Sequence, residues 1–513
     1  DLHLSIRRQR QMCIRDRAKT FQGLEEVLAR ELTELGASNI EIGRRMVSFT
    51  GDKALMYKAN FCLRTAIRIL KPIKHFTAKT ADEVYDAVKA IAWEEYLDNM
   101  SSFAVDAVVF SNEFRHSKFV AYKVKDAIVD YFREKTGNRP SVRISNPDLA
   151  INIHIAEDQC TLSLDSSGES LHRRGYRQEQ VEAPLNEVLA AGMILMTGWR
   201  GECDLIDPMC GSGTIPIEAA LIARNIAPGI FRKEFGFEKW KDFDQNLLDS
   251  IYNDDSQERE FTHKIYGYDN NPRANEIATH NVKAAGVSKD VILKIQPFQQ
   301  FEQPKEKSII ITNPPYGERI SSGDLLELYK MIGERLKHAF TGNDAWILSY
   351  RDECFDQIGL KASVKIPLFN GALECQFRQY QLFDGKYKAF RSENAGKDFK
   401  PRRNTDSPRP KTRSFSRDGE QKGFRKKEDR PSGSRKNEGF RKEEGFRGRK
   451  AGDGKEFTRE RRNEFRFKDE SKPRTPRPST DDGRPKQAPG PRYMHSRRKP
   501  EIERENNESM DKQ

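Results

Sequence analysis

The sequence contains few cysteines, no long apolar run and no cluster of metal-binding residues. Its seven cysteines are scattered, without a CxxC pair or a Cys/His cluster at the spacing of a zinc site. This pattern is typical of a reducing compartment and predicts that no metal ion is bound. Because no apolar segment is long enough to cross a membrane, we expect a cytoplasmic protein that does not contact a membrane.

Positive charge is concentrated at one end of the chain. The formal net charge of the 513 residues is +12, but residues 386–513 alone carry 40 Lys and Arg against 23 Asp and Glu. That tail is therefore at +17, and the preceding chain is slightly acidic. The tail lacks hydrophobic periodicity and is predicted to be disordered. Its recurring Gly-Phe-Arg triplets suit contacts with RNA phosphates and bases; a solubilising tail is the alternative.

The chain before the tail divides into four predicted parts. Residues 1–17 contain five Arg and no apolar core, so they are not a secretory signal. They resemble translated adapter sequence and are treated as a leader that does not look native. Residues 18–70 and 71–165 each combine amphipathic helices with alternating strands, which predicts two α+β units. Residues 166–385 alternate apolar strands with helices, which is typical of a parallel α/β sheet.

A glycine-rich turn follows the first strand of the α/β part, in the segment DLIDPMCGSGTIPIEAA. Gly211 and Gly213 would let the backbone approach a ligand closely, and the following helix would present its N-terminal amides. The turn lacks the Lys-Ser/Thr ending of a phosphate-binding loop, so ATP and GTP are not expected. Asp269 follows the next strand, where an acidic side chain can hold two ribose hydroxyls.

The segment TNPPYGERI follows the apolar strand at 308–312. Two prolines hold the backbone rigid, so the Asn313 side-chain oxygen and the Pro314 carbonyl can both accept hydrogen bonds from one exocyclic amine. Tyr316 can stack on a flipped-out base. This arrangement would fix the amine for reaction with an electrophilic methyl group. A proline-rich structural loop is the alternative.

A short basic segment, LHRRGYR at 171–177, precedes the α/β part. It is predicted to be a basic linker. The candidate substrate-binding residues in it are Arg173, Arg174, Tyr176 and Arg177.

In combination, these motifs resemble the class I S-adenosylmethionine-dependent N-methyltransferases, and the wider chain resembles the THUMP-domain RNA guanine-N2-methyltransferases. The wider resemblance covers about residues 18–385 and rests on segments such as FCLRTAIRIL, DSSGESLHRRGYR, NIAPGIFRKEFGFEKWKDFD and NGALECQFRQYQLF. It implies a ferredoxin-like unit at 18–70, an RNA-binding THUMP domain at 71–165 and a Rossmann-like methyltransferase domain at 166–385.

The resemblance also implies the cofactor, the substrate and the residues that bind them. S-adenosylmethionine would donate its methyl group to the N2 amine of a guanine, in 23S rRNA or a precursor of the large ribosomal subunit. Asn313, Pro314 and Tyr316 would be the catalytic residues. The family has an acidic residue near the adenine amine, where this sequence offers Gln296 or Gln299. The cofactor-binding set is Asp207, Pro208, Gly211, Gly213, Thr214, Asp269 and Gln296.

Several alternatives remain open at this stage. tRNA could replace rRNA as the substrate. DNA adenine or cytosine methyltransferases and protein glutamine methyltransferases share the Asn-Pro-Pro-Tyr signal but would lack the THUMP-like block. A non-catalytic RNA-binding factor of ribosome assembly is the alternative from another class. Because the basic tail follows residue 385, a second, 7-methylguanosine-forming domain found in some relatives is not expected here.

Overall fold

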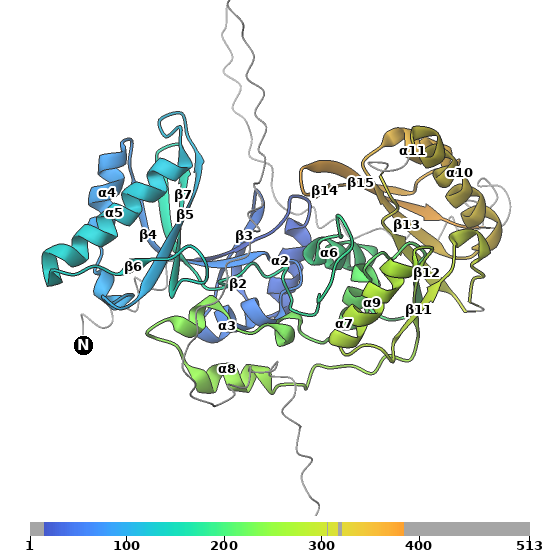
Figure 1. Ribbon diagram of the computed structural model, residues 1–513, viewed down its shortest axis with the longest axis horizontal. Helices are drawn as coiled ribbons and strands as arrows, with labels where there is room; N and C mark the ends of the chain where they lie inside the picture. Colours follow the sequence, from blue (N-terminus) through green and yellow to red (C-terminus); the bar gives the residue numbers. More distant parts are fainter. Residues whose placement is uncertain (1–14, 305, 317–320, 384–513) are drawn as a thin grey trace, which may run out of the picture. The chain divides into compact units, whose positions relative to one another are not determined.

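The structure is a computed structural model that describes residues 15–304, 306–316 and 321–383 (Figure 1). All of these residues belong to one compact unit. They form two sheets, each with its own helices. The predicted tail at 386–513 lies outside the described residues, as does most of the predicted leader. No helix in the described part of the chain is long and apolar enough to cross a membrane.

The first sheet has eight strands in the order β2-β3-β1-β4-β8-β7-β5-β6. Strand β4 pairs with β1 on one side and with β8 on the other. The predicted boundary between residues 70 and 71 therefore falls inside one strand, and the two predicted α+β units share a sheet. The strands are β1 (Asp16–Lys19), β2 (Ser38–Gly43), β3 (Met46–Thr50), β4 (Arg68–Thr77), β5 (Ser102–Phe110), β6 (Ser141–Val142), β7 (Leu149–Ala156) and β8 (Gln159–Asp165).

Helices pack on this sheet through the apolar stripes predicted from the sequence. Leu28, Leu32, Val84 and Val88 are all buried, and they share a core with alternate strand residues such as Ile153. Figure 1 shows α4 and α5 lying on the same side of the strands. The elements are α2 (Glu25–Glu34), α3 (Lys53–Cys62), α4 (Ala81–Lys89), the short helix η1 (Trp93–Glu95) and α5 (Ser117–Thr136).

The predicted leader reaches into this fold. Asp16 and Arg17 lie in β1, which pairs with β3 and β4. Strand alternation turns Asp16 toward the core beside Ala18, so its carboxyl group is buried. Treating all of residues 1–17 as outside the fold was therefore wrong for its last residues.

The second sheet is doubly wound, as predicted for residues 166–385. Its order is β11-β10-β9-β12-β13-β15-β14. The first five strands of this order are parallel, and β15 runs antiparallel to β13 and β14. The strands are β9 (Asp204–Asp207), β10 (Ile265–Asp269), β11 (Val291–Ile295), β12 (Ser308–Thr312), β13 (Asp344–Ser349), β14 (Val364–Asn370) and β15 (Leu373–Gln381).

Helices cover both faces of the second sheet. Leu205 and Ile309 pack with α6 and α7 on one face, whereas Ile206 and Ile310 pack with α10 and α11 on the other. Both faces of each central strand are therefore buried, which explains their continuous apolar runs. The elements are α6 (Glu187–Thr197), α7 (Thr214–Ala223), α9 (Pro272–Ala284), η4 (Phe298–Gln300), α10 (Ser322–Ala339) and α11 (Asp352–Gln357).

Residues 225–262 form an insertion between α7 and β10 that contains η2 (Pro228–Phe231), η3 (Gly236–Lys239) and α8 (Gln245–Tyr252). Most of its buried apolar side chains pack in the core of the first sheet, whereas Ile226, Phe231 and Phe261 pack against that of the second. The ring of Phe237 stacks on that of Tyr57 in α3, with centroids 4.0 Å apart. The insertion thus joins the second sheet to the first, and it lengthens the chain between Gly213 and Asp269.

Candidate active site

The carboxyl ends of the parallel strands bring the predicted motifs to one edge of the second sheet. The strand order reverses between β9 and β12, the position where doubly wound sheets bind ligands. The glycine turn follows β9, Asp269 ends β10, and Asn313 follows β12. Two hydrogen bonds join these segments. The Gly211 amide donates to Asp269 Oδ2 at 2.9 Å, and the Thr312 hydroxyl donates to Asp207 Oδ1 at 2.9 Å.

The glycine turn has the backbone conformation that its residues predict. Gly211 and Gly213 have φ values of +54° and +81°, which side chains disfavour. A Cβ on Gly213 would also come within 3.2 Å of Ala278 in α9. Gly213 precedes α7, and no side chain caps that helix. The first turn of α7 therefore presents backbone amides to the edge of the sheet, where an anionic group binds favourably.

Asp207 lies buried at the point where the strand order reverses. Its carboxylate is buried and accepts hydrogen bonds from the Thr312 hydroxyl and from the Met209 amide, the latter at 3.3 Å. Burial, opposed by these two hydrogen bonds and aided by the nearby Asp269 charge, raises its pKa to about 7. The Asp207 side chain thus bridges β9 and β12. Direct contact between Asp207 or Pro208 and the cofactor stays a prediction.

Asp269 and Gln296 lie half-buried at the open edge. The Asp269 carboxylate accepts hydrogen bonds from the amides of Gly211 and Asn271, both at 2.9 Å, which fixes its orientation. Each carboxylate oxygen keeps a second lone pair for a hydroxyl donor. The backbone amide of Gln296 donates a hydrogen bond to the Asp269 carbonyl, and its side-chain Nε2 donates one to the Gln300 carbonyl at 2.7 Å. This leaves Gln296 Oε1 as an acceptor.

The Asn-Pro-Pro-Tyr segment folds back on itself. The Tyr316 hydroxyl donates a hydrogen bond to Asn313 Oδ1. The Tyr316 ring meets that of Tyr350 edge-on, with centroids 5.4 Å apart, and burial raises the pKa of Tyr316 far above its usual range. Sequence reasoning missed Tyr350, which follows β13 as Asn313 follows β12. Its position after a strand was the available signal.

The structure corrects part of the predicted RNA-binding linker. Arg174 and Tyr176 are almost completely buried. The Arg174 guanidinium lies 3.4 Å from Glu218 of α7 and donates to the Leu171 carbonyl at 2.8 Å. The Tyr176 hydroxyl donates to Glu218 at 2.9 Å. Neither side chain can reach RNA, because both are used to bind α7.

Arg177 also faces inward and contacts the glycine turn. Its guanidinium donates to Ser212 Oγ and Thr214 Oγ1, both at 3.0 Å, and pairs with Glu187 at 2.7 Å. A rigid planar fork that bonds both ends of a turn fixes the shape of that turn. Arg173 is the exposed member of the four, paired with Glu169 on the surface.

The described residues contain no group of His, Cys, Asp or Glu side chains that could hold a metal ion. Their six cysteines are all unpaired.

Three family descriptions match consecutive parts of the chain. An RlmL ferredoxin-like domain matches residues 17–70, a THUMP domain matches 78–165, and an RMKL-like methyltransferase domain matches 174–379. A Synechocystis protein, named as a candidate RNA methyltransferase, is 38% identical over 369 residues, which cover 71% of this chain and 96% of that protein. The chain belongs to the RMKL-like methyltransferases with a THUMP domain. The predicted family and fold class are confirmed.

Two further comparisons bear on the activity of this methyltransferase. The ribosomal RNA large subunit methyltransferase K/L of Syntrophotalea carbinolica is 40% identical over 380 residues, 71% of this chain. The chain spans about half the length of such curated relatives; the match covers 53% of the Syntrophotalea protein. The crystal structure of SMU.472, a candidate methyltransferase complexed with SAH, is 31% identical. It covers 73% of this chain and 99% of its own, with a TM-score of 0.65.

Proposed function

We propose that this methyltransferase transfers the methyl group of S-adenosylmethionine to the exocyclic N2 amine of a guanine in RNA, with large-subunit rRNA as the substrate. One observation carries the proposal. Asn313 and Pro314 follow β12 directly beside the glycine turn, because the Thr312 hydroxyl is hydrogen-bonded to Asp207 at the end of β9. An amine held by these two residues would therefore lie next to a ligand held by the turn.

The side chains and amides at the edge fit the proposed cofactor. The uncapped first turn of α7 suits its carboxylate, the Asp269 carboxylate suits the ribose hydroxyls, and Gln296 Oε1 suits the adenine amine. S-adenosylmethionine supplies an electrophilic methyl group when bound. The SAH in the SMU.472 structure is the compound that remains after methyl transfer, which supports this choice.

Asn313 and Pro314 would orient the amine. Two fixed acceptors can take both N–H groups, so the nitrogen lone pair is directed away from the base plane toward the cofactor side. No general base is needed, since the methylated amine is acidic enough to release a proton to water. Catalysis then rests on positioning and on preorganised dipoles. The Tyr316 hydroxyl already donates to Asn313 Oδ1, which fixes the amide before the substrate arrives.

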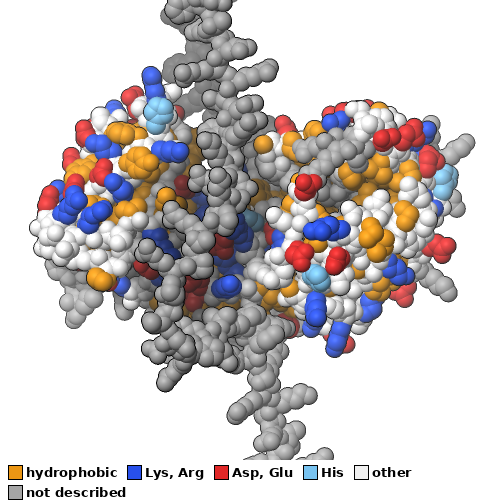
Figure 2. All heavy atoms as spheres, in the orientation of Figure 1, with side chains coloured by type: hydrophobic (Ala, Val, Ile, Leu, Met, Phe, Trp, Pro, Cys, Tyr) orange, Lys and Arg blue, Asp and Glu red, His pale blue; other side chains and the backbone are white. Residues whose placement is uncertain are grey.

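Exposed residues of the THUMP domain support RNA as the substrate. Phe119 and Tyr122 on α5 are 51% and 60% exposed, and Arg115 and Lys118 are exposed beside them. Figure 2 shows Lys and Arg side chains among apolar ones over the region of α4 and α5. Aromatic rings next to cations suit unpaired bases and phosphates. The relatives named as ribosomal RNA large subunit methyltransferases favour rRNA within this class.

The experiment that tests the proposal replaces the orienting amide. We expect Asn313→Ala to lower methyl transfer to rRNA by about two orders of magnitude, the scale seen when one preorganised hydrogen-bonding group is lost. The Kd values for RNA and S-adenosylmethionine should stay within about twofold, because the variant keeps both binding surfaces. Tyr316→Phe removes only the hydroxyl that holds Asn313, so its rate of methyl transfer should fall between those of the unaltered chain and Asn313→Ala. Unchanged turnover in Asn313→Ala would exclude the proposed role.

A further inference from the structure

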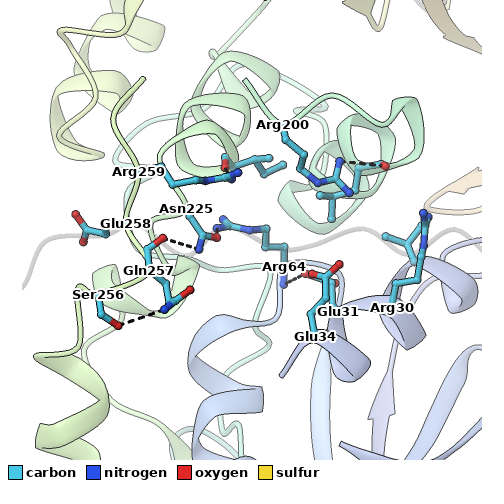
Figure 3. A pocket seen from close by; sticks show the side chains of 13 residues that line it. Arg30, Glu31, Glu34, Arg64, Arg200, Asn225, Ser256, Gln257, Glu258 and Arg259 are labelled. Atoms are coloured by element: carbon cyan, nitrogen blue, oxygen red, sulfur yellow. Dashed lines mark hydrogen bonds between the residues drawn. The ribbon is translucent and has the colours of Figure 1, made fainter. Parts of the chain in front are cut away.

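A cavity of about 470 Å³ lies at the end of α7 opposite the glycine turn (Figure 3). Its walls come from α2, the turn after α3, the loop after α6, the end of α7 and residues 256–259 of the insertion. α7 has ten residues, and a helix of that length spans about 15 Å. The cavity is therefore separate from the candidate active site, and its volume is typical of ligand pockets.

Four arginines line this cavity: Arg30, Arg64, Arg200 and Arg259. Three glutamates line it as well, so the arginines exceed the carboxylates by one. Figure 3 shows Arg64 extending across the cavity toward Asn225, with Arg200 and Arg259 above it. Burial lowers the pKa of Arg200; Glu34 raises it, and the charge of Arg30 lowers it further. The Arg30 and Arg200 guanidinium groups therefore repel each other, in a cavity with a net positive charge.

Arg64 is the strongest indication that a ligand belongs here. The residue is 7% exposed, and its Nη1 is buried without a hydrogen-bond partner. Its Nη2 reaches Asn225 only at 3.4 Å. A buried guanidinium with an unused donor is costly, so native proteins provide it with a partner.

Glu31 attracts the Arg64 charge but accepts no hydrogen bond from its Nη1. Glu31 accepts hydrogen bonds from the backbone amides of Arg64 and Thr65, at 2.8 and 3.0 Å, and from the Thr65 hydroxyl. Its charge thus stabilises the turn after α3. Glu34 and Glu258 complete the acidic residues of the wall, against four arginines.

We infer that this cavity binds a phosphate group. Guanidinium forks bind phosphate oxygens through paired hydrogen bonds, and a phosphate oxygen would supply the acceptor that Arg64 Nη1 lacks. Ser256, Asn225 and Gln257 line the same wall and can add neutral hydrogen bonds. The phosphate could belong to an RNA strand or to a phosphorylated small molecule, and one titration separates these sources.

The test uses the full chain and inorganic pyrophosphate as the probe. Binding is measured by isothermal titration calorimetry for the unaltered chain and for Arg30→Ala/Arg259→Ala, whose two arginines are exposed. We expect the double variant to weaken pyrophosphate binding at least tenfold. The control, Arg44→Ala/Arg133→Ala, removes two exposed arginines outside the cavity and should bind as the unaltered chain does.

A competition arm identifies the source of the phosphate. If rRNA displaces pyrophosphate, the phosphate comes from the substrate strand; if the two bind together, it comes from a small molecule. Absence of pyrophosphate binding, or equal weakening in both double variants at unchanged melting temperature, would overturn the inference. This result does not depend on methyl transfer, so it is independent of the proposed function.

Discussion

At the scale of single residues, the linker 171–177 shows where composition misleads. A run of basic side chains between two domains predicts RNA contact, yet three of its four candidate residues face inward. Glu218, which pairs with Arg174, lies 44 residues further along the chain, and the Ser212 hydroxyl lies 35 residues beyond Arg177. Partners so distant in sequence become visible only in the folded chain.

Arg177 is a positioning residue for the glycine turn. We expect Arg177→Lys to weaken S-adenosylmethionine binding at least tenfold, because a lysine cannot bond Ser212, Thr214 and Glu187 together. Calorimetry of cofactor binding checks this, with Arg173→Ala as the control on the same linker. The KM for the cofactor should rise more than kcat falls. A folded Arg177→Lys protein with unchanged cofactor affinity would contradict the assignment.

Asp16 predicts a pH dependence of stability. Burial raises its pKa from 3.8 to about 7, with Lys71 opposing the shift. The folded chain therefore binds this proton more tightly than the unfolded chain does, and stability falls as pH rises from about 4 to 7. Asp16→Asn should raise the free energy of unfolding by at least about 1 kcal/mol at pH 8.

The comparison needs two pH values to separate charge from packing. Denaturant unfolding of both proteins should show the advantage of Asp16→Asn at pH 8 and a much smaller one at pH 4.5. An advantage of equal size at both values would mean that the carboxylate charge is not the cause.

At the scale of elements, hydrophobic periodicity predicted the helices and strands, but it did not predict which elements pair or pack with one another. The apolar spacing of α2 and α4 correctly predicted their buried faces. The pattern could not show that β4 joins the first two units in one sheet, because both units have strands of similar composition. Nor could it show that the insertion packs on α3, since its aromatic residues have no regular period.

The exposed face of α5 is predicted to bind RNA. Phe119→Ala/Tyr122→Ala should weaken RNA binding about tenfold or more, since base stacking on one aromatic ring contributes about 1–3 kcal/mol. Filter binding or fluorescence anisotropy with rRNA fragments measures this. Ile42→Ala removes another exposed apolar side chain, 56% exposed on β2, and should leave affinity unchanged. Equal affinities of all three proteins would remove α5 from the RNA-binding surface.

At the scale of the whole molecule, the order of the motifs along the chain was the strongest guide. A glycine turn, an acidic strand end and Asn-Pro-Pro-Tyr, in that sequence, predicted one edge of a doubly wound sheet, and the strand order places all three there. The arginine-lined cavity could not be anticipated, since its walls come from five separated segments. The central proposal is that these domains together bind and methylate large-subunit rRNA.

Nucleoside mass spectrometry of purified rRNA and tRNA tests that proposal most directly. The RNA would come from cells with the gene, without it, and with Asn313→Ala in its place. We predict loss of N2-methylguanosine from large-subunit rRNA in both altered strains and no change in tRNA. Loss confined to tRNA, or loss of a methylated adenosine, would contradict the assigned substrate or amine. No change in any methylated nucleoside would contradict RNA methylation itself.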